Sequence, residues 1–325
     1  MTVHDILFED GMRFSMKTAQ APVGGQAIVE GVMFQNATHA VSAIRRNDDT
    51  IETFEQKKPI RPRIAVGKKI PLIRGLFALV ESSANGASHM NFASDRYGVN
   101  PGEEEPEEAS QGQLAKWLGV ALLGVLSFFF GKLMFTLLPA FLASLFSYFP
   151  ALSGHVIQNV LEAVIKLTLL FSYLYLISLT PLVKRLFQYH GAEHKVINCV
   201  ESGKALTVEN VRTSSRLHYR CGSSFLIFTV IVGFFVYLIV PTDPLWLRLV
   251  CRIALLPVVI GLSFEVLQLT NKAQSIRGLR VIALPGLWLQ YLTTKEPDDS
   301  QIEVAIYAFE ALEKQEHNLH ENALG

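Results

Sequence analysis

The residues best suited to chemistry lie in the polar, basic segment 188–225, which separates two strongly apolar segments. Within it, His190, Glu193 and His194 form the pattern H-x-x-E-H. On a helix the two histidines project from one face with Cβ atoms about 5–6 Å apart, which suits two imidazoles on one tetrahedral zinc ion. Glu193 is then placed to accept a proton from water that the metal makes acidic. The pattern predicts a divalent-metal site, with zinc preferred and Glu193 as the general base.

A metal site needs at least a third protein ligand, and the sequence offers two sources for it. Glu265 comes near the expected cytoplasmic end of an apolar helix, whereas His218 and Cys221 lie in the same polar segment with the spacing H-x-x-C. A closed set of His190, His194, His218 and Cys221 would make a structural zinc site. Three ligands and an open fourth position would make a catalytic one. The sequence leaves this choice open.

Two other interpretations of these residues also stay open. Cys221, at the start of an apolar helix, could act as a nucleophile whose thiolate is stabilised by the helix N-terminus and by Arg220, with a histidine as base. We rank this below a metal site. Gly191 costs a helix about 1 kcal/mol relative to alanine, so the segment need not be helical. In that alternative it is a juxtamembrane loop whose histidines touch lipid head groups.

The composition is that of a membrane protein and not of an ordinary soluble domain. Of 325 residues, 50% are hydrophobic and only 18% are charged. The formal net charge is zero, so no basic field predicts specific binding to nucleic acid. Three cysteines, an odd number, indicate reduced thiols and no disulfide framework. The acidic start of the chain does not have the pattern of a cleaved signal peptide.

Four apolar segments are each long enough, at ~1.5 Å per residue, to cross a hydrocarbon layer of roughly 30 Å. They cover residues 114–138, 156–181, 223–240 and 245–269. Lysine and arginine gather in the central loop 183–222 and after the last segment, so both termini and this loop are expected to face the cytoplasm. The predicted fold class is an α-helical polytopic protein of the bacterial inner (plasma) membrane, with four transmembrane helices and a small N-terminal mainly-β cytoplasmic domain.

Several charges fall inside the apolar segments, where ionisable groups are costly and suggest a role. Glu162 and Lys166 are four residues apart and can pair on one helix face. Arg248 and Arg252 begin their helix near the far interface and are expected to snorkel toward water. Glu265 has no such simple explanation, which is why we count it among the candidate ligands.

The chain outside the membrane domain (114–279) divides into four further parts. They are a lead-in (1–23), a β-rich domain with an amphipathic helix (24–97), an acidic linker (98–113), and an interfacial segment followed by a C-terminal amphipathic helix (280–325). Runs rich in β-branched and aromatic residues at 24–34, 39–46 and 50–57 predict a small antiparallel sheet. Gly24 and Gly25 before Gln26, and Gly31 after Glu30, mark a place where the backbone turns or is closely approached. Glu30 is either a site carboxylate or, as we favour, an edge glutamate on a solvated strand.

Six motifs in order carry a resemblance to a known family. They are GGQAIVEGVMF at 24–34, KKIPLIRGLFALVES at 68–82, YHGAEHKVINCVE at 189–201, LTVENVR at 206–212, SRLHYRCGSSFL at 215–226 and PGLWLQYLTTKEPDDSQIEVAI at 285–306. Over about residues 24–312 the chain resembles the YqhQ-type family of bacterial membrane proteins, domain of unknown function 1385. Where we expect Met-Arg-Gly and His-Pro-Arg-Cys, the chain has Phe34-Gln35-Asn36 and His218-Tyr219-Arg220-Cys221, and the second departure keeps both candidate ligands.

The family is described as predicted metal-dependent enzymes of the membrane, so the resemblance implies a metal site without naming a substrate. Carried onto this chain, it implies a site of His190, Glu193, His194, His218 and Cys221. Glu30 and Arg74 are possible contributors that the same resemblance adds.

The functional prediction is a metal-dependent hydrolase at the cytoplasmic membrane face, whose partners are the lipid bilayer and a membrane-associated substrate. The alternative is a non-catalytic scaffold or assembly factor, in which a structural metal or a hydrogen-bonded His/Cys cluster holds the central loop and the β domain recruits a cytoplasmic protein. A transporter is disfavoured, because four helices without an internal repeat offer little pathway.

Overall fold

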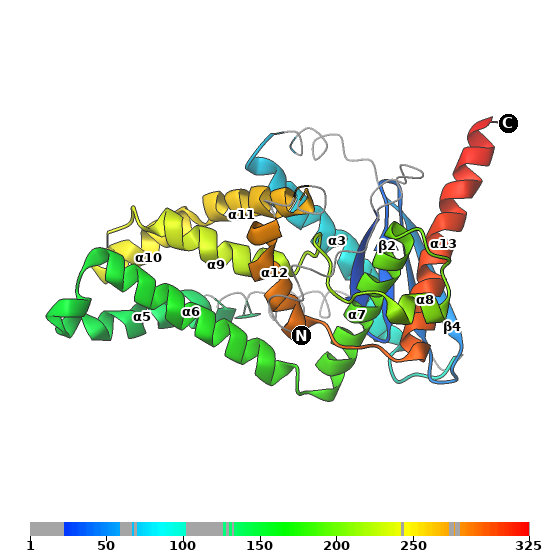
Figure 1. Ribbon diagram of the computed structural model, residues 1–325, viewed down its shortest axis with the longest axis horizontal. Coiled ribbons are helices and arrows are strands. Elements are labelled where there is room, and N and C mark those ends of the chain that lie inside the picture. Colours follow the sequence, from blue (N-terminus) through cyan, green and yellow to red (C-terminus); the bar gives the residue numbers. More distant parts are fainter. Residues whose placement is uncertain are drawn as a thin grey trace, which may run out of the picture.

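The computed structural model describes residues 23–58, 67, 70–101, 126–127, 130–131, 133–241, 244–272, 276 and 280–324. A β-sheet lies at one end of the molecule and an arm of apolar helices at the other (Figure 1). The expected lead-in up to residue 22, residues 102–113 of the acidic linker and the first half of the first apolar segment lie outside the described residues.

The sheet has four antiparallel strands in the order β1-β2-β3-β4. The strands are β1 (Gly24–Ile28), β2 (Gly31–Gln35), β3 (His39–Arg45) and β4 (Ile51–Lys57). The run 24–34, which we expected to be one strand, is a hairpin instead, because the chain reverses at Glu30, whose φ is +51°. The predicted small antiparallel sheet is therefore confirmed, but Glu30 lies in a turn and not on a strand edge.

Helices cover both faces of the sheet (Figure 1). Because side chains alternate along a strand, Met33 points to one face, where it packs with Phe92 of α3 (Ile73–Arg96). Phe34 points to the other face, which is covered by α7 (Pro181–Glu201) and by α13 (Asp299–Leu324). The rings of Phe34 and Phe309 meet edge to face there.

The central segment 183–222, expected to be a loop, is largely helical. It contains most of α7 and the short α8 (Val208–Thr213). Pro181 begins α7, where its missing N–H costs nothing, since the first N–H groups of a helix have no intrahelical partner. Tyr189, Ala192 and Val196 are buried in the same core as β2, β3 and α13. The polar segment is therefore part of the packed layer beside the sheet.

The arm is built mainly of helices with apolar surfaces. Its elements are the π-helical turn Leu133–Leu137, α5 (Leu138–Leu145), the 3-10 turns Phe146–Tyr148 and Pro150–Leu152, α6 (His155–Ile177), α9 (Ser224–Tyr237), α10 (Leu245–Ala254), α11 (Leu256–Asn271) and α12 (Arg280–Thr293). α12 crosses between the arm and the sheet end (Figure 1).

Within the described residues of the arm, one helix is long and apolar enough to cross a membrane by itself, which is α6. α10 and α11 satisfy the same test only as a pair bent by 49°, which would bring the described candidates to two. The 14 residues of α9 rise only about 21 Å, less than the roughly 30 Å of a hydrocarbon layer. The mainly helical fold is confirmed, whereas the predicted number of four transmembrane helices is not.

The two arginines of α10 do not snorkel. Arg248 and Arg252 are only 2% and 3% exposed, and both form ion pairs with Glu162 of α6. The expectation that these arginines reach water was therefore wrong. They stay inside because their helix packs against a buried carboxylate, and a buried charge is tolerated when it is paired.

Candidate functional site

The helix α7 presents His190, Glu193 and His194 on one buried face. Gly191, which made a helix doubtful from sequence, is explained by packing: a Cβ there would lie 2.1 Å from the carbonyl oxygen of Lys295. Only glycine allows the chain after α12 to approach this closely. The residue that weakens the helix is therefore the one that brings α12 next to the histidines.

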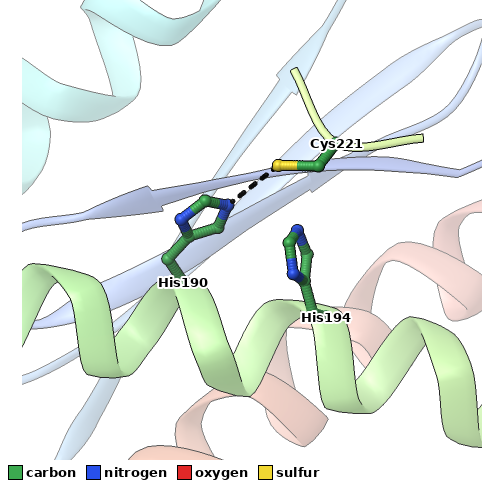
Figure 2. A group of neighbouring side chains, drawn as sticks. All are labelled: His190, His194 and Cys221. Carbon is green, nitrogen blue, oxygen red and sulfur yellow. Dashed lines mark hydrogen bonds between the residues drawn. The ribbon is translucent and has the colours of Figure 1, made fainter. Parts of the chain in front are cut away.

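Three potential metal ligands converge at this face. His190 and His194 of α7 and Cys221, just before α9, place their ligand atoms within 4.8 Å of one another. The sulfur of Cys221 is 3.4 Å from Nε2 of His190, and the two imidazole rings lie 4.5 Å apart (Figure 2). Residues separated by about thirty positions in the chain thus form one compact group of two nitrogens and one sulfur.

Both imidazole rings are oriented by main-chain carbonyl groups. Nδ1 of His190 lies 2.8 Å from the oxygen of Thr293, and Nδ1 of His194 lies 2.7 Å from the oxygen of Arg216. A carbonyl oxygen only accepts, so each Nδ1 donates, and each ring, when it is neutral, has its lone pair on Nε2. Metal-binding histidines usually make this second contact. Two imidazole nitrogens and a thiolate are also donors that zinc binds well, so the residues fit that ion.

Close contact shifts the pKa values of the group. Burial raises the pKa of the Cys221 thiol, but the nearby imidazoles of His194 and His190 outweigh burial and hold it well below its usual value. Burial lowers the pKa of His190, yet contact with Cys221 raises it to about 9. The surroundings therefore favour a Cys221 thiolate, which is the form of cysteine that binds metals.

Glu193 lies beside the three ligands without belonging to them. One of its carboxylate oxygens is 4.0 Å from Nε2 of His190. Its side chain packs directly on Gly25 of β1, where a Cβ would lie 2.5 Å from Oε1 of Glu193. Burial raises the pKa of Glu193, and the neighbouring His194 and His190 offset this only in part. A carboxylate with a raised pKa suits proton transfer near neutral pH.

A cavity of about 530 Å³ opens beside the group. His190, Glu193, His194 and Cys221 all line it, together with His218. The candidate ligands and the candidate base therefore face one space that is large enough for a small molecule.

His218 is near the group but is engaged elsewhere. Its ring lies 5.8 Å from that of His194. Its Nε2 is 3.3 Å from a carboxylate oxygen of Glu201, and its Nδ1 accepts from the N–H of Arg220. Burial, followed by the neighbouring His194, lowers the pKa of His218 to about 4. His218 therefore lines the same cavity but does not belong to the group of three converging ligands.

The remaining candidates lie away from the histidines. Glu265 accepts from Nε of Arg74 at 2.7 Å and from the N–H of Leu72, so these two candidates pair with each other and fasten α11 to α3. Glu30 forms an ion pair with Arg185 at the start of α7. Among the described residues, the group of three ligands thus contains Cys221 and lacks Glu265.

Sequence reasoning missed the residues that act through main-chain atoms. Thr293 and Arg216 orient the histidines with carbonyl oxygens, which every residue type carries, so no side-chain pattern reveals them. Glu201 gave no signal either, since a single carboxylate near a helix end is usually solvated. Gly25 did give one, because a glycine pair indicates close backbone approach, and Glu193 is what approaches it.

The fold and site together define a class of protein: mainly helical, with a small antiparallel sheet and a buried His/His/Cys group beside a carboxylate. The family model described as "Protein of unknown function (DUF1385)" matches residues 70–315, and the chain belongs to that family. It is 57% identical over 292 residues to "Uncharacterized protein YqhQ" of Bacillus subtilis (strain 168), covering 89% of this chain and 91% of that protein. The family membership that the motifs predicted is therefore confirmed. No solved structure matches the chain.

Proposed function

We propose that this protein is a metal-dependent hydrolase of the bacterial plasma membrane that binds a divalent cation, preferably zinc, through His190, His194 and Cys221. The convergence of three donors on the wall of a cavity carries the proposal. Catalytic zinc sites have three protein ligands and keep one position for water or substrate, whereas structural sites are closed by four. His218, the natural fourth ligand, has its Nε2 next to Glu201 instead.

A zinc ion held there would supply a Lewis acid that polarises the bond to be cleaved and makes water more acidic. The chain's own part in the chemistry is proton transfer by Glu193. Its carboxylate takes a proton from the attacking water and later gives it to the leaving atom of the substrate, so Glu193 ends each turnover as it began. Gly25 and the buried helix α7 hold this carboxylate beside the ligands.

The apolar arm supports a membrane location. Only 17% of the apolar stretch of α6 is buried inside the protein, unlike a helix in a soluble core. Leu176 and Phe235 are each 63% exposed, and Ile239 is 78% exposed. Large exposed apolar side chains of this kind support the proposed contact with lipid. We keep the four spans and the cytoplasmic termini as part of this proposal.

The cavity supports a substrate that is partly apolar. Leu79 and Leu186 contribute apolar walls and Arg220 a cationic one. Such a lining suits a membrane-associated molecule that carries a hydrocarbon group next to an ester, amide or phosphate bond.

Metal content tests the site directly. The full chain, purified in detergent, should carry about one zinc per molecule by elemental mass spectrometry, and a His190→Ala, His194→Ala double variant should carry none. A His39→Ala, His155→Ala double variant is the matched control, because neither residue belongs to the group. If wild type and both variants are equally free of metal, the scaffold alternative replaces the hydrolase.

Turnover tests the base. Zinc-loaded protein in lipid nanodiscs would be given p-nitrophenyl palmitate and p-nitrophenyl phosphorylcholine. Glu193→Gln should keep its zinc but lose about 100- to 10,000-fold in rate. Glu310→Gln, an exposed change on α13, should behave as wild type. A Glu193→Gln protein with undiminished turnover would show that another group moves the proton.

A further inference from the structure

The apolar arm holds a second cavity, of about 520 Å³, among α6, α9 and the α10–α11 pair. None of its lining residues lines the cavity beside the histidines. Its walls are largely hydrocarbon, from residues such as Leu170, Leu174, Val230 and Leu256. Its size falls in the range of pockets that bind small molecules.

Among the described residues that line this largely apolar space, two carry a positive charge, Lys166 of α6 and Arg252 of α10. No aspartate or glutamate occurs among the described residues that form its lining. Cationic side chains within apolar walls complement a ligand that has a negative head and a hydrocarbon body.

Arg252 is held in place for such a ligand. It is 3% exposed and forms an ion pair with Glu162, while Asn159 and the ring of Tyr237 contact its guanidinium. Arg252 is also among the residues that line the cavity, so a ligand there would meet a guanidinium that these contacts already hold in place.

We propose that this cavity binds a single-chain anionic amphiphile, with its head group on Arg252 and Lys166 and its chain along Leu170, Leu174 and Val230. The same chemistry is found in a fatty carboxylate and in a lysophospholipid phosphate. α6, which lies largely exposed and is the best candidate span, gives such a molecule a route from the bilayer. This site is independent of the metal group, so either proposal can fail alone.

Equilibrium binding to the full chain, delipidated in a non-ionic detergent, tests the proposal. The probes are radiolabelled palmitate, 1-palmitoyl lysophosphatidate and, as a neutral molecule of the same chain length, 1-palmitoylglycerol. Both anions should bind at least about tenfold more tightly than the neutral probe. This is the difference in affinity expected when one charge-assisted hydrogen bond is gained. Tight binding of only one anion would identify the head group as carboxylate or phosphate.

Variants locate the site. Arg252→Gln should remove the preference for anions. Because this change also leaves Glu162 with one partner fewer, a second variant avoids the ion pairs: Thr229→Trp fills the cavity and should abolish binding of all three probes. Thr168→Trp is its control, since each threonine bonds a carbonyl of its own helix and Thr168 is exposed outside the cavity.

His190→Ala should leave binding unchanged, because that residue lines the other cavity. The proposal is overturned if 1-palmitoylglycerol binds as tightly as the anions, or if Thr229→Trp binds them as wild type does.

Discussion

Replacing Gly25 with alanine should displace the carboxylate of Glu193 without touching any of the three candidate ligands. The new Cβ would lie 2.5 Å from Oε1 of Glu193 and 2.6 Å from its Cγ, where ordinary contact begins at 3.4 Å. Glu193 must therefore withdraw by nearly 1 Å, because α7 itself is fixed in the core. Overpacking of this kind costs about 1–3 kcal/mol. A misplacement of about 1 Å at a reacting group costs on the order of 100-fold in rate.

Gly24→Ala is the matched control, since its Cβ would meet only Cγ of Gln35, at 3.9 Å. Thermal unfolding, followed by tryptophan fluorescence, compares the two variants. Each kcal/mol lost from the free energy of unfolding should lower the melting temperature by about 2–4 °C. Gly25→Ala should melt several degrees below wild type, keep its zinc and lose turnover, while Gly24→Ala matches wild type. Equal melting temperatures would refute the close packing of Gly25 on Glu193. Loss of zinc from Gly25→Ala would refute the proposal that Glu193 lies beside the three metal ligands without being one of them.

Three further predictions rest on the same structure. Zinc at a hundred times its Kd should stabilise the wild type by about 2.7 kcal/mol. Cys221→Ala should lose this rise in melting temperature, and Cys251→Ala, outside the ligand group, should keep it; an equal rise in both would exclude Cys221 as a ligand. Burial lowers the pKa of His89 from 6.5 to about 4. Between pH 6.5 and 4 the imidazole is therefore protonated in the unfolded chain and neutral in the folded one. The free energy of unfolding should then fall by at most ~3 kcal/mol between pH 6.5 and 4, and urea titrations should show a smaller fall in His89→Gln; the same fall in both proteins would contradict this. Gly191→Ala should cost more than ~3 kcal/mol, because its Cβ would lie 2.1 Å from a main-chain oxygen, and Gly222→Ala, with nothing within 4 Å, should be near neutral in the same titration; comparable stability of the two would refute the close contact.

The parts of the fold that depend on local pattern were predictable. Runs rich in β-branched and aromatic residues indicated a sheet, and H-x-x-E-H at helical spacing put His190 and His194 on one face. The H-x-x-C spacing brought Cys221 into the candidate set, although sequence could not choose between Cys221 and Glu265. That choice depends on which helices pack together, and α11 packs against α3, where Arg74 takes the carboxylate of Glu265.

The parts that depend on tertiary contact were not predictable. The sequence of α7 is polar enough to be mistaken for an exposed loop. It is polar because this buried helix carries the side chains of the candidate site. Arg248 and Arg252 were assigned to the interface because nothing local reveals that Glu162, some eighty residues earlier, lies beside them. Gly31 indicated a turn or a close backbone approach here, but sequence did not assign the turn to Glu30, since a glutamate at positive φ is uncommon.

The carbonyl oxygen of Thr293 that orients His190 comes 103 residues later in the chain than the imidazole it holds. During synthesis, α7 therefore leaves the ribosome long before its histidine can be fixed in a ligand-binding orientation, and contacts of such sequence separation form late in folding. The site should then mature only when α12 and α13 have been made and packed. A chain that stops before α12 would expose two histidines and a cysteine without their geometry. If the group binds a metal as we propose, the order of synthesis would delay metal capture until the protein is almost complete.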